Sequence, residues 1–259
     1  MLASAPAAKV QNVPQIGYET DLGTFVLGKA ESVLASKLGQ DLQKKVDLIF
    51  TSPPFPLNRK KKYGNLKGQE YVRWLAGMAK PLRALLKPKG SIVIEMGNAW
   101  EKGKPVMSTL ALKALLAFQE TGDFTLCQQF VWHNPARLPS PAQWVNVERI
   151  RLKDAYTHLW WMSCTDRPHA DNRQVLKEYS NSMKDLLAKQ KYNTGKRPSQ
   201  HNIGKTSFLK SNDGAIPSNV PRWRTPNRRR SIRYFVASTI YSATLRECRS
   251  VWRNSSSNS

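Results

Sequence analysis

Two short apolar runs, separated by a segment with helical spacing, constrain the fold of this chain most strongly. The first run is VDLIF at 46–50 and the second is SIVIEMG at 91–97. Between them, apolar residues recur every three to four positions from Tyr71 to Leu86, which predicts a helix kinked at Pro81. A strand, a helix and a second strand in this order favour a parallel pair of strands.

Further along the chain, the same kind of patterning continues. We expect helices over 108–119, ending near Gly122, and over 173–190. Two more strands are predicted at 126–134 and 157–163, as an antiparallel pair at one edge of the sheet. The alternation of strands and helices predicts an α/β protein with a mostly parallel sheet.

The charge of the chain favours a nucleic acid as its partner. Lys and Arg number 41 against 18 Asp and Glu, a net charge of +23, and phosphates attract clustered cations over long range. The alternative is a basic surface on an otherwise ordinary protein. No run of about 18 apolar residues and no secretory signal is found, so we expect a cytoplasmic protein without a membrane partner. Three scattered Cys fit that compartment, and four scattered His predict no metal site.

The composition changes at Pro221. Residues 221–259 contain nine Arg, no Lys and a single acidic residue, and they show neither the strand period nor the helix period. One interpretation is an arm that binds RNA or DNA. The other is a segment translated out of frame after Val220, which we expect to be disordered.

The sequence TSPPF at 51–55 carries the clearest chemical signal. It follows the strand 46–50, and ligands of open α/β sheets bind beyond the carboxyl ends of the strands. Two prolines stiffen this loop, the hydroxyl of Ser52 and the carbonyl of Pro53 can accept hydrogen bonds from an amine, and Phe55 can stack on a ring. Such a loop suits a flat base with an exocyclic amine that has been turned out of the helix. The alternative is a stiff loop with Phe55 in the core.

At these residues the chain resembles the amino-methylating DNA methyltransferases, and most of all the cytosine-N4 branch of PvuII-type modification enzymes. The similarity spans about residues 17–220, and it is carried by the strings VDLIFTSPPFPLNRKKKYGN, GSIVIEMGNAW, NPARLPSPAQWVNVERIRLKDA and RPSQHNIGK. The resemblance implies a Rossmann-like methyltransferase sheet, S-adenosylmethionine as cofactor, duplex DNA as substrate and a role in a restriction-modification system. It assigns the binding of the target amine to Ser52, Pro53, Pro54 and Phe55.

The resemblance also implies a division into domains. A catalytic core with the TSPPF loop is expected over 17–134, a target-recognition region with an edge strand over 135–220, and the aberrant tail over 221–259. DNA contacts are expected from the basic run that follows the loop and from polar residues in the recognition region. These candidates are Arg59, Lys60, Lys61, Lys62, Arg137, Gln143, Asn146, Arg149 and Arg151.

One part of the family pattern is missing from the sequence. Similar enzymes carry a Gly-rich cofactor loop near the C-terminus, whereas the 14 glycines of this chain form no Gly-x-Gly pair and none follows Gly214. We therefore expect a sheet that is incomplete at its cofactor-binding strand and weak binding of S-adenosylmethionine. The sequence assigns no particular residue to the binding of the cofactor.

Three functions remain open on the sequence. The first is an active methyltransferase for the N4 amine of cytosine, with the N6 amine of adenine as a close variant. The second is a truncated remnant that binds DNA without turnover. The third is a basic RNA-binding or chromatin-like protein, for which the TSPPF loop would have no purpose. Direct methyl transfer needs no covalent intermediate, and no Cys follows a proline as a carbon-5 methylating nucleophile would.

Overall fold

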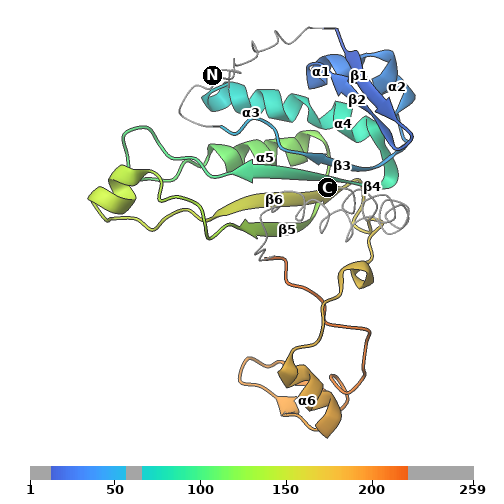
Figure 1. Ribbon diagram of the computed structural model, residues 1–259, viewed down its shortest axis with the longest axis vertical. Helices are drawn as coiled ribbons and strands as arrows, with labels where there is room; N and C mark the ends of the chain where they lie inside the picture. Colours follow the sequence, from blue (N-terminus) through green and yellow to red (C-terminus); the bar gives the residue numbers. More distant parts are fainter. Residues whose placement is uncertain (1–12, 57–65, 221–259) are drawn as a thin grey trace, which may run out of the picture. The chain divides into compact units, whose positions relative to one another are not determined.

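The computed structural model describes residues 13–56 and 66–220 (Figure 1). The chain divides into two compact units, residues 1–168 and 169–259. The segment 221–259, expected to be a disordered tail, lies outside the described residues. The basic run from Arg59 to Lys62 lies outside them as well.

The first unit is built on a four-stranded sheet with the order β3-β4-β6-β5. Its strands are β3 (Val46–Thr51), β4 (Leu86–Gly97), β5 (Thr125–His133) and β6 (Tyr156–Ser163). Strands β3 and β4 are parallel, which confirms the predicted crossover, and β4–β6 and β5–β6 are antiparallel. The sheet of the described residues is therefore mixed, not mostly parallel.

Strand β6 lies inside the sheet and not at its edge. It is hydrogen-bonded to β4 on one side and to β5 on the other, so the predicted antiparallel pair is correct but β5 is its outer member. Seven of its eight residues are buried, including Trp160 and Trp161. A continuous apolar run such as LWWM is typical of a strand that is covered on both faces. A domain boundary at 134 would remove this strand from the sheet.

Helices α3 (Gly68–Gly77), α4 (Ala79–Leu85) and α5 (Leu110–Thr121) lie along one face of the sheet (Figure 1). The helix predicted across Pro81 is two helices, because α3 ends before Met78 and Pro81 falls in the first turn of α4. Proline is tolerated there, since the first backbone N–H groups of a helix have no partner within the helix. Helix α5 ends at the predicted Gly122.

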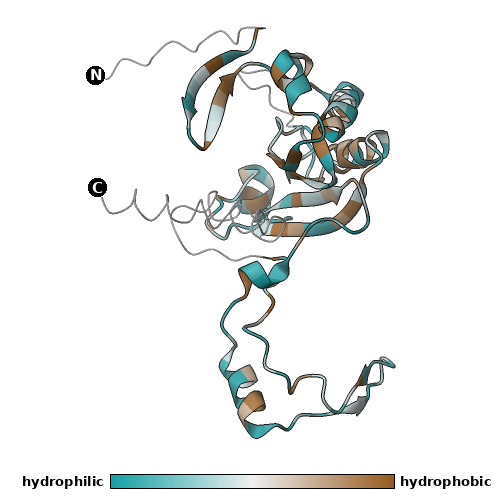
Figure 2. Cartoon of the chain, turned by 90° about the vertical axis from the view of Figure 1, so that its right-hand side faces the viewer, coloured by the Kyte–Doolittle hydropathy of each residue, from teal (hydrophilic) through white to brown (hydrophobic). Residues whose placement is uncertain are grey.

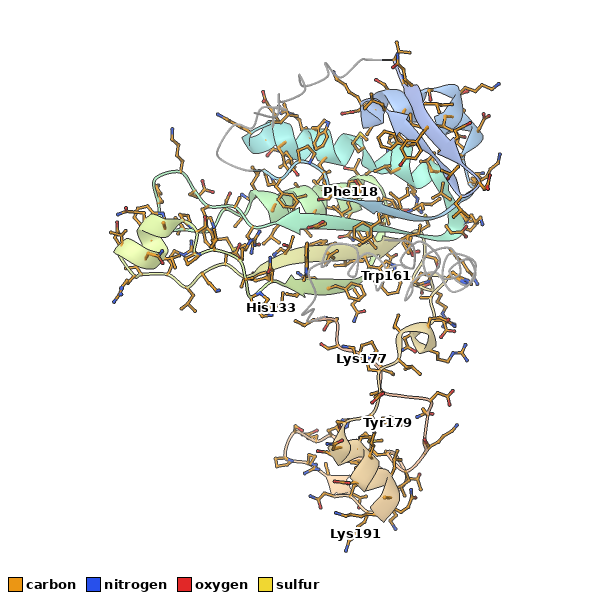
Figure 3. All side chains as sticks on the ribbon, in the orientation of Figure 1. Phe118, His133, Trp161, Lys177, Tyr179 and Lys191 are labelled. Carbon is orange, nitrogen blue, oxygen red and sulfur yellow. The ribbon has the colours of Figure 1, made fainter. Side chains whose placement is uncertain are left out.

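The core lies between this face of the sheet and the helices. Ile92, Ile94 and Met96 alternate along β4 toward the helices and pack with Leu115 and Phe118 of α5. All five are fully buried, and Phe118 is labelled on α5 in Figure 3. The alternate residues of β4 and the apolar face of α5 therefore pack in one cluster. This packing holds the carboxyl end of β4 in place.

An N-terminal hairpin was not predicted from the sequence. Strands β1 (Gln15–Thr20) and β2 (Gly23–Leu27) form a separate antiparallel pair, followed by α1 (Ala30–Ala35) and α2 (Lys37–Asp41). Most of its apolar side chains are exposed, and hydrophobic and hydrophilic residues both occur along it (Figure 2). Short strands without a buried face give a weak periodic signal, which explains the omission.

The second unit contains little regular structure among its described residues. It comprises η2 (Asn172–Val175), α6 (Asn181–Lys189), β7 (Gly195–Lys196) and β8 (Asn202–Ile203). The helix predicted over 173–190 is thus shorter, because the hydroxyl of Ser180 accepts the N–H of Met183 and starts α6 there. No described helix of either unit is long and apolar enough to cross a membrane.

Candidate active site at the carboxyl edge of the sheet

The loop after β3 presents the predicted amine-binding residues. Thr51 pairs with Ile94 at the end of the parallel ladder, and the chain then leaves the sheet. Ser52 is exposed, Pro53 and Pro54 are half-buried, and Pro56 is buried. The proline rings therefore pack partly or fully into the protein, while Ser52 is exposed and its hydroxyl is accessible to a ligand.

Phe55 is held against the neighbouring strand. A Cβ atom built on Gly97 would lie 2.6 Å from ring atoms Cδ2 and Cε2 of Phe55, so the ring rests directly on the glycine at the end of β4. The ring also packs against the core cluster, yet it is only partly buried. Packing in the core and stacking on a ligand are therefore compatible for this side chain.

A chain of polar side chains lies directly beyond this contact. Asn98, the residue after Gly97, donates from Nδ2 to Oδ1 of Asp154 at 2.8 Å and accepts at Oδ1 from His158 Nε2 at 3.0 Å. Arg137 donates from one guanidinium nitrogen to Oδ2 of Asp154 at 3.1 Å and to the carbonyl of Tyr156 at 2.9 Å. These bonds connect the carboxyl end of β4 with the segment that enters β6.

The partners of His158 define its protonation state. Its Nε2 donates to the carbonyl oxygen of Asn98, and its Nδ1 accepts from the amide of Gln129. Burial lowers the pKa of His158 below its usual value, and the carboxylate of Asp154 opposes that shift in part. The imidazole is thus neutral at neutral pH and acts as a link between β5 and the end of β4.

These polar residues were not predicted as a group from the sequence. Gln129, Asn98 and His158 lie on three different strands or their ends, and no spacing along the chain relates them. The available signal was the presence of polar residues within or directly after apolar runs, which is unusual in buried strands.

An excursion over residues 135–155 joins β5 to β6 beyond the same edge of the sheet (Figure 1). It contains the π-helix η1 (Gln143–Val147). Within it, Arg151 places its guanidinium carbon 3.1 Å from the ring centroid of Trp100, in the loop that follows β4. This stacking and the Asn98–Asp154 bond attach the excursion to the end of β4 at two points.

The five DNA-contact candidates of the excursion differ in their contacts and in their exposure. Arg137 and Arg151 make the intramolecular contacts described above, so they support the excursion. Gln143 is exposed and donates to Glu148 at 2.8 Å. Asn146 and Arg149 are exposed, and Arg149 has a left-handed backbone with φ of 54°. The side-chain hydrogen bonds and ring contact of Arg137, Gln143 and Arg151 are with Asp154, Tyr156, Glu148 and Trp100.

The Ser-Pro-Pro-Phe loop presents possible hydrogen-bond acceptors at the carboxyl end of β3, and the described residues around it do not fit the methyl donor. Gly97 is the glycine at the carboxyl end of β4, and the ring of Phe55 fills the space beside it. A glycine-rich turn that would approach a cofactor is not present after β3 or β4 in the described ranges. Within these ranges, no group of His, Cys, Asp and Glu could hold a metal ion.

The two described cysteines are not suited to nucleophilic attack. Burial raises the pKa of the Cys127 thiol to about 11, and burial also raises that of Cys164. A thiol with a raised pKa carries little of the reactive thiolate at neutral pH.

Comparison with known proteins identifies the class of the chain. Residues 46–255 match the sequence model of the DNA methylase family, and these residues contain the TSPPF loop and all four strands of the sheet. The chain belongs to this DNA methylase family. The matched range continues into the segment after Pro221, whose origin stays a prediction.

Its relatives include the type II methyltransferase M.PvuII of Proteus hauseri. The two are 43% identical over 205 residues, which are 78% of this chain and 60% of M.PvuII. The solved structure of the PvuII DNA methyltransferase, described as cytosine-N4-specific, superposes with a TM-score of 0.50 at 34% identity, over 65% of this chain and 62% of that one. The chain thus spans about three fifths of the length of these relatives. The predicted Rossmann-like methyltransferase fold and the resemblance to PvuII-type enzymes are confirmed.

Proposed function

We propose that this chain is part of a site-specific DNA methyltransferase that methylates the exocyclic N4 amine of cytosine in duplex DNA. The observation that carries the proposal is the Ser-Pro-Pro-Phe loop at the carboxyl end of β3, in a chain similar to M.PvuII over most of its length. By the same similarity we propose a role in a restriction-modification system in the cytoplasm, where methylation would protect the DNA of the host cell.

The residues of the loop suit the needs of amine methylation. The lone pair of an exocyclic amine is delocalised into the base, so the amine is a poor nucleophile. Hydrogen bonds from its N–H groups to Ser52 Oγ and to the carbonyl of Pro53 favour a tetrahedral nitrogen with a localised lone pair. They also stabilise the positive charge that develops on the nitrogen during methyl transfer, which is a gain made mainly in the transition state.

Pro54 and Phe55 position those acceptors. The two prolines restrict the backbone, so the carbonyl of Pro53 keeps its direction without a hydrogen bond to the sheet. The ring of Phe55 rests on Gly97 and offers its exposed part to the face of a base. S-adenosylmethionine is the methyl donor that we propose, held by residues other than those described.

Two other functions are the alternatives. Adenine N6 is also an exocyclic amine on a flat ring, and the same acceptors would suit it. A chain that binds DNA without turnover is the second alternative, since the described residues hold no glycine-rich turn for the donor. The net charge of +23 agrees with DNA as partner under each of the three.

Transfer of a labelled methyl group from S-adenosylmethionine to duplex DNA tests the proposal. We expect incorporation by the wild-type chain and a loss of about 100-fold in Ser52→Ala, the usual effect of removing one polar contact to the reacting group. Ser182→Ala, an exposed serine of α6, is the matched control and should retain wild-type activity. DNA binding without any incorporation would instead favour the inactive alternative.

A further inference from the structure

One leucine of the excursion is almost fully exposed although its neighbours are fixed. Leu152 has a relative exposure of 90%, the highest among the large apolar residues that the structure describes as exposed. On its N-terminal side, Arg151 stacks on Trp100. On its C-terminal side, Lys153 donates to the carbonyl of Pro135 at 2.7 Å. The backbone thus presents this side chain to solvent in a defined place.

A short path of contacts connects Leu152 with the amine-binding loop. Asp154, two residues further, accepts the hydrogen bond of Asn98 at 2.8 Å. Asn98 follows Gly97, and Gly97 carries the ring of Phe55. The exposed leucine and the base-stacking residue are therefore held by the same end of β4.

The charge around Leu152 fits a polyanion, and the excursion also exposes the apolar side chains of Leu138, Val147 and Ile150. Residues 135–155 contain four basic and two acidic residues, and the exposed Arg149 and Asn146 lie on the same excursion. Exposed cations favour phosphates, and an amide can bond to a base edge. An apolar side chain on a basic surface can fill a gap between the stacked bases of a duplex.

We propose that Leu152 enters the base stack of the DNA at the place left by the extruded target base. A base that is turned into an active site leaves a gap, and closing it with an apolar side chain offsets part of the lost stacking. The proposal rests on the proposed function, because it concerns the same extruded base. Leu152 is a positioning residue in this account, since it contacts the duplex and not the reacting amine.

An abasic site provides the gap without extrusion, so binding to it tests the role of Leu152 without cofactor and without a known recognition sequence. The measurement compares the affinity of the chain for a mixed-sequence duplex with one central abasic site and for the same duplex intact, by fluorescence anisotropy at one salt concentration. We expect the wild-type chain to prefer the abasic duplex about tenfold, as burial of one leucine side chain allows.

Three variants make the test specific. Leu152→Ala should lose the preference while its affinity for the intact duplex stays the same, and Leu152→Met should keep it. Leu138→Ala, an equally apolar change at a residue of the same excursion with 79% exposure, should also keep it. A purely structural role of Leu152 would change binding to both duplexes alike.

The proposal is overturned if the wild-type chain shows no preference, if Leu152→Ala retains it, or if Leu138→Ala loses it equally. Failure of the proposed function shows in a different measurement, because methyl transfer is absent from this assay. A chain that prefers abasic DNA through Leu152 but transfers no methyl group would contradict the enzymatic activity only.

Discussion

At the scale of single residues, Gly97 controls the position of the loop. Its missing side chain gives the Phe55 ring its place, at a distance where no Cβ atom fits. We expect Gly97→Ala to lower the free energy of unfolding by about 1–3 kcal/mol through overpacking, and to reduce methyl transfer because the loop shifts. Urea denaturation and the transfer assay measure the two effects.

Gly77→Ala is the matched control for that change. Gly77 ends α3, and a Cβ atom there would meet nothing within 4 Å. Alanine at this position should leave stability unchanged or raise it by up to about 1 kcal/mol. If Gly97→Ala were as stable and active as Gly77→Ala, the contact between Phe55 and Gly97 would have no role.

His158 makes stability depend on pH. Because burial lowers its pKa in the folded chain, the unfolded chain binds the proton more readily. Its contribution to stability is present above the ordinary pKa of about 6.5 and is lost as the pH falls through that value toward the folded pKa. Urea denaturation at several pH values between 5 and 8 should therefore show a decline below pH 6.5.

Replacement of His158 by Gln should flatten that decline. The variant His201→Gln, at an exposed histidine of the second unit, should leave the pH dependence as in the wild type. An unchanged slope in His158→Gln would mean that groups other than His158 produce the dependence.

At the scale of elements, the carboxylate of Asp154 ties the excursion to the sheet. It accepts from Asn98 and from Arg137, so Asp154→Ala removes the acceptor of the Asn98 amide and one of the two acceptors of Arg137. We expect trypsin to cleave after the exposed Arg149 several times faster in this variant, because the loop opens more often. Asp166→Ala, at an exposed residue after β6, should show the wild-type rate, and equal rates in both would contradict the tether.

The sequence predicted most elements of the sheet and helices because their apolar periods are strong. Strand β4 contains the apolar run IVIEM, and helix α5 carries leucines at helical spacing, so each element could be predicted from its own residues. It did not predict that β6 lies between β4 and β5, since order across a sheet depends on contacts between distant segments. The amine-binding residues were recognisable in one short string. The polar chain around His158 was not, because folding alone brings its members together.

At the scale of the whole molecule, charge and family membership agree. A net charge of +23 favours DNA, and the chain belongs to a family of DNA methylases. The first unit carries the loop, the sheet and the excursion, so the proposed base-binding loop and Leu152 lie in one unit. The chain spans about three fifths of the length of M.PvuII, and the donor site is proposed to depend on residues other than those described.

The identity of the methylated base shows whether the chain transfers a methyl group to the N4 amine of cytosine. Duplex DNA of mixed sequence is incubated with the purified chain and S-adenosylmethionine carrying a heavy-isotope methyl group, digested to nucleosides and analysed by mass spectrometry. We expect heavy N4-methylcytosine with the wild-type chain and its loss in Ser52→Ala. Heavy N6-methyladenine in its place, or no labelled nucleoside at all, would contradict it.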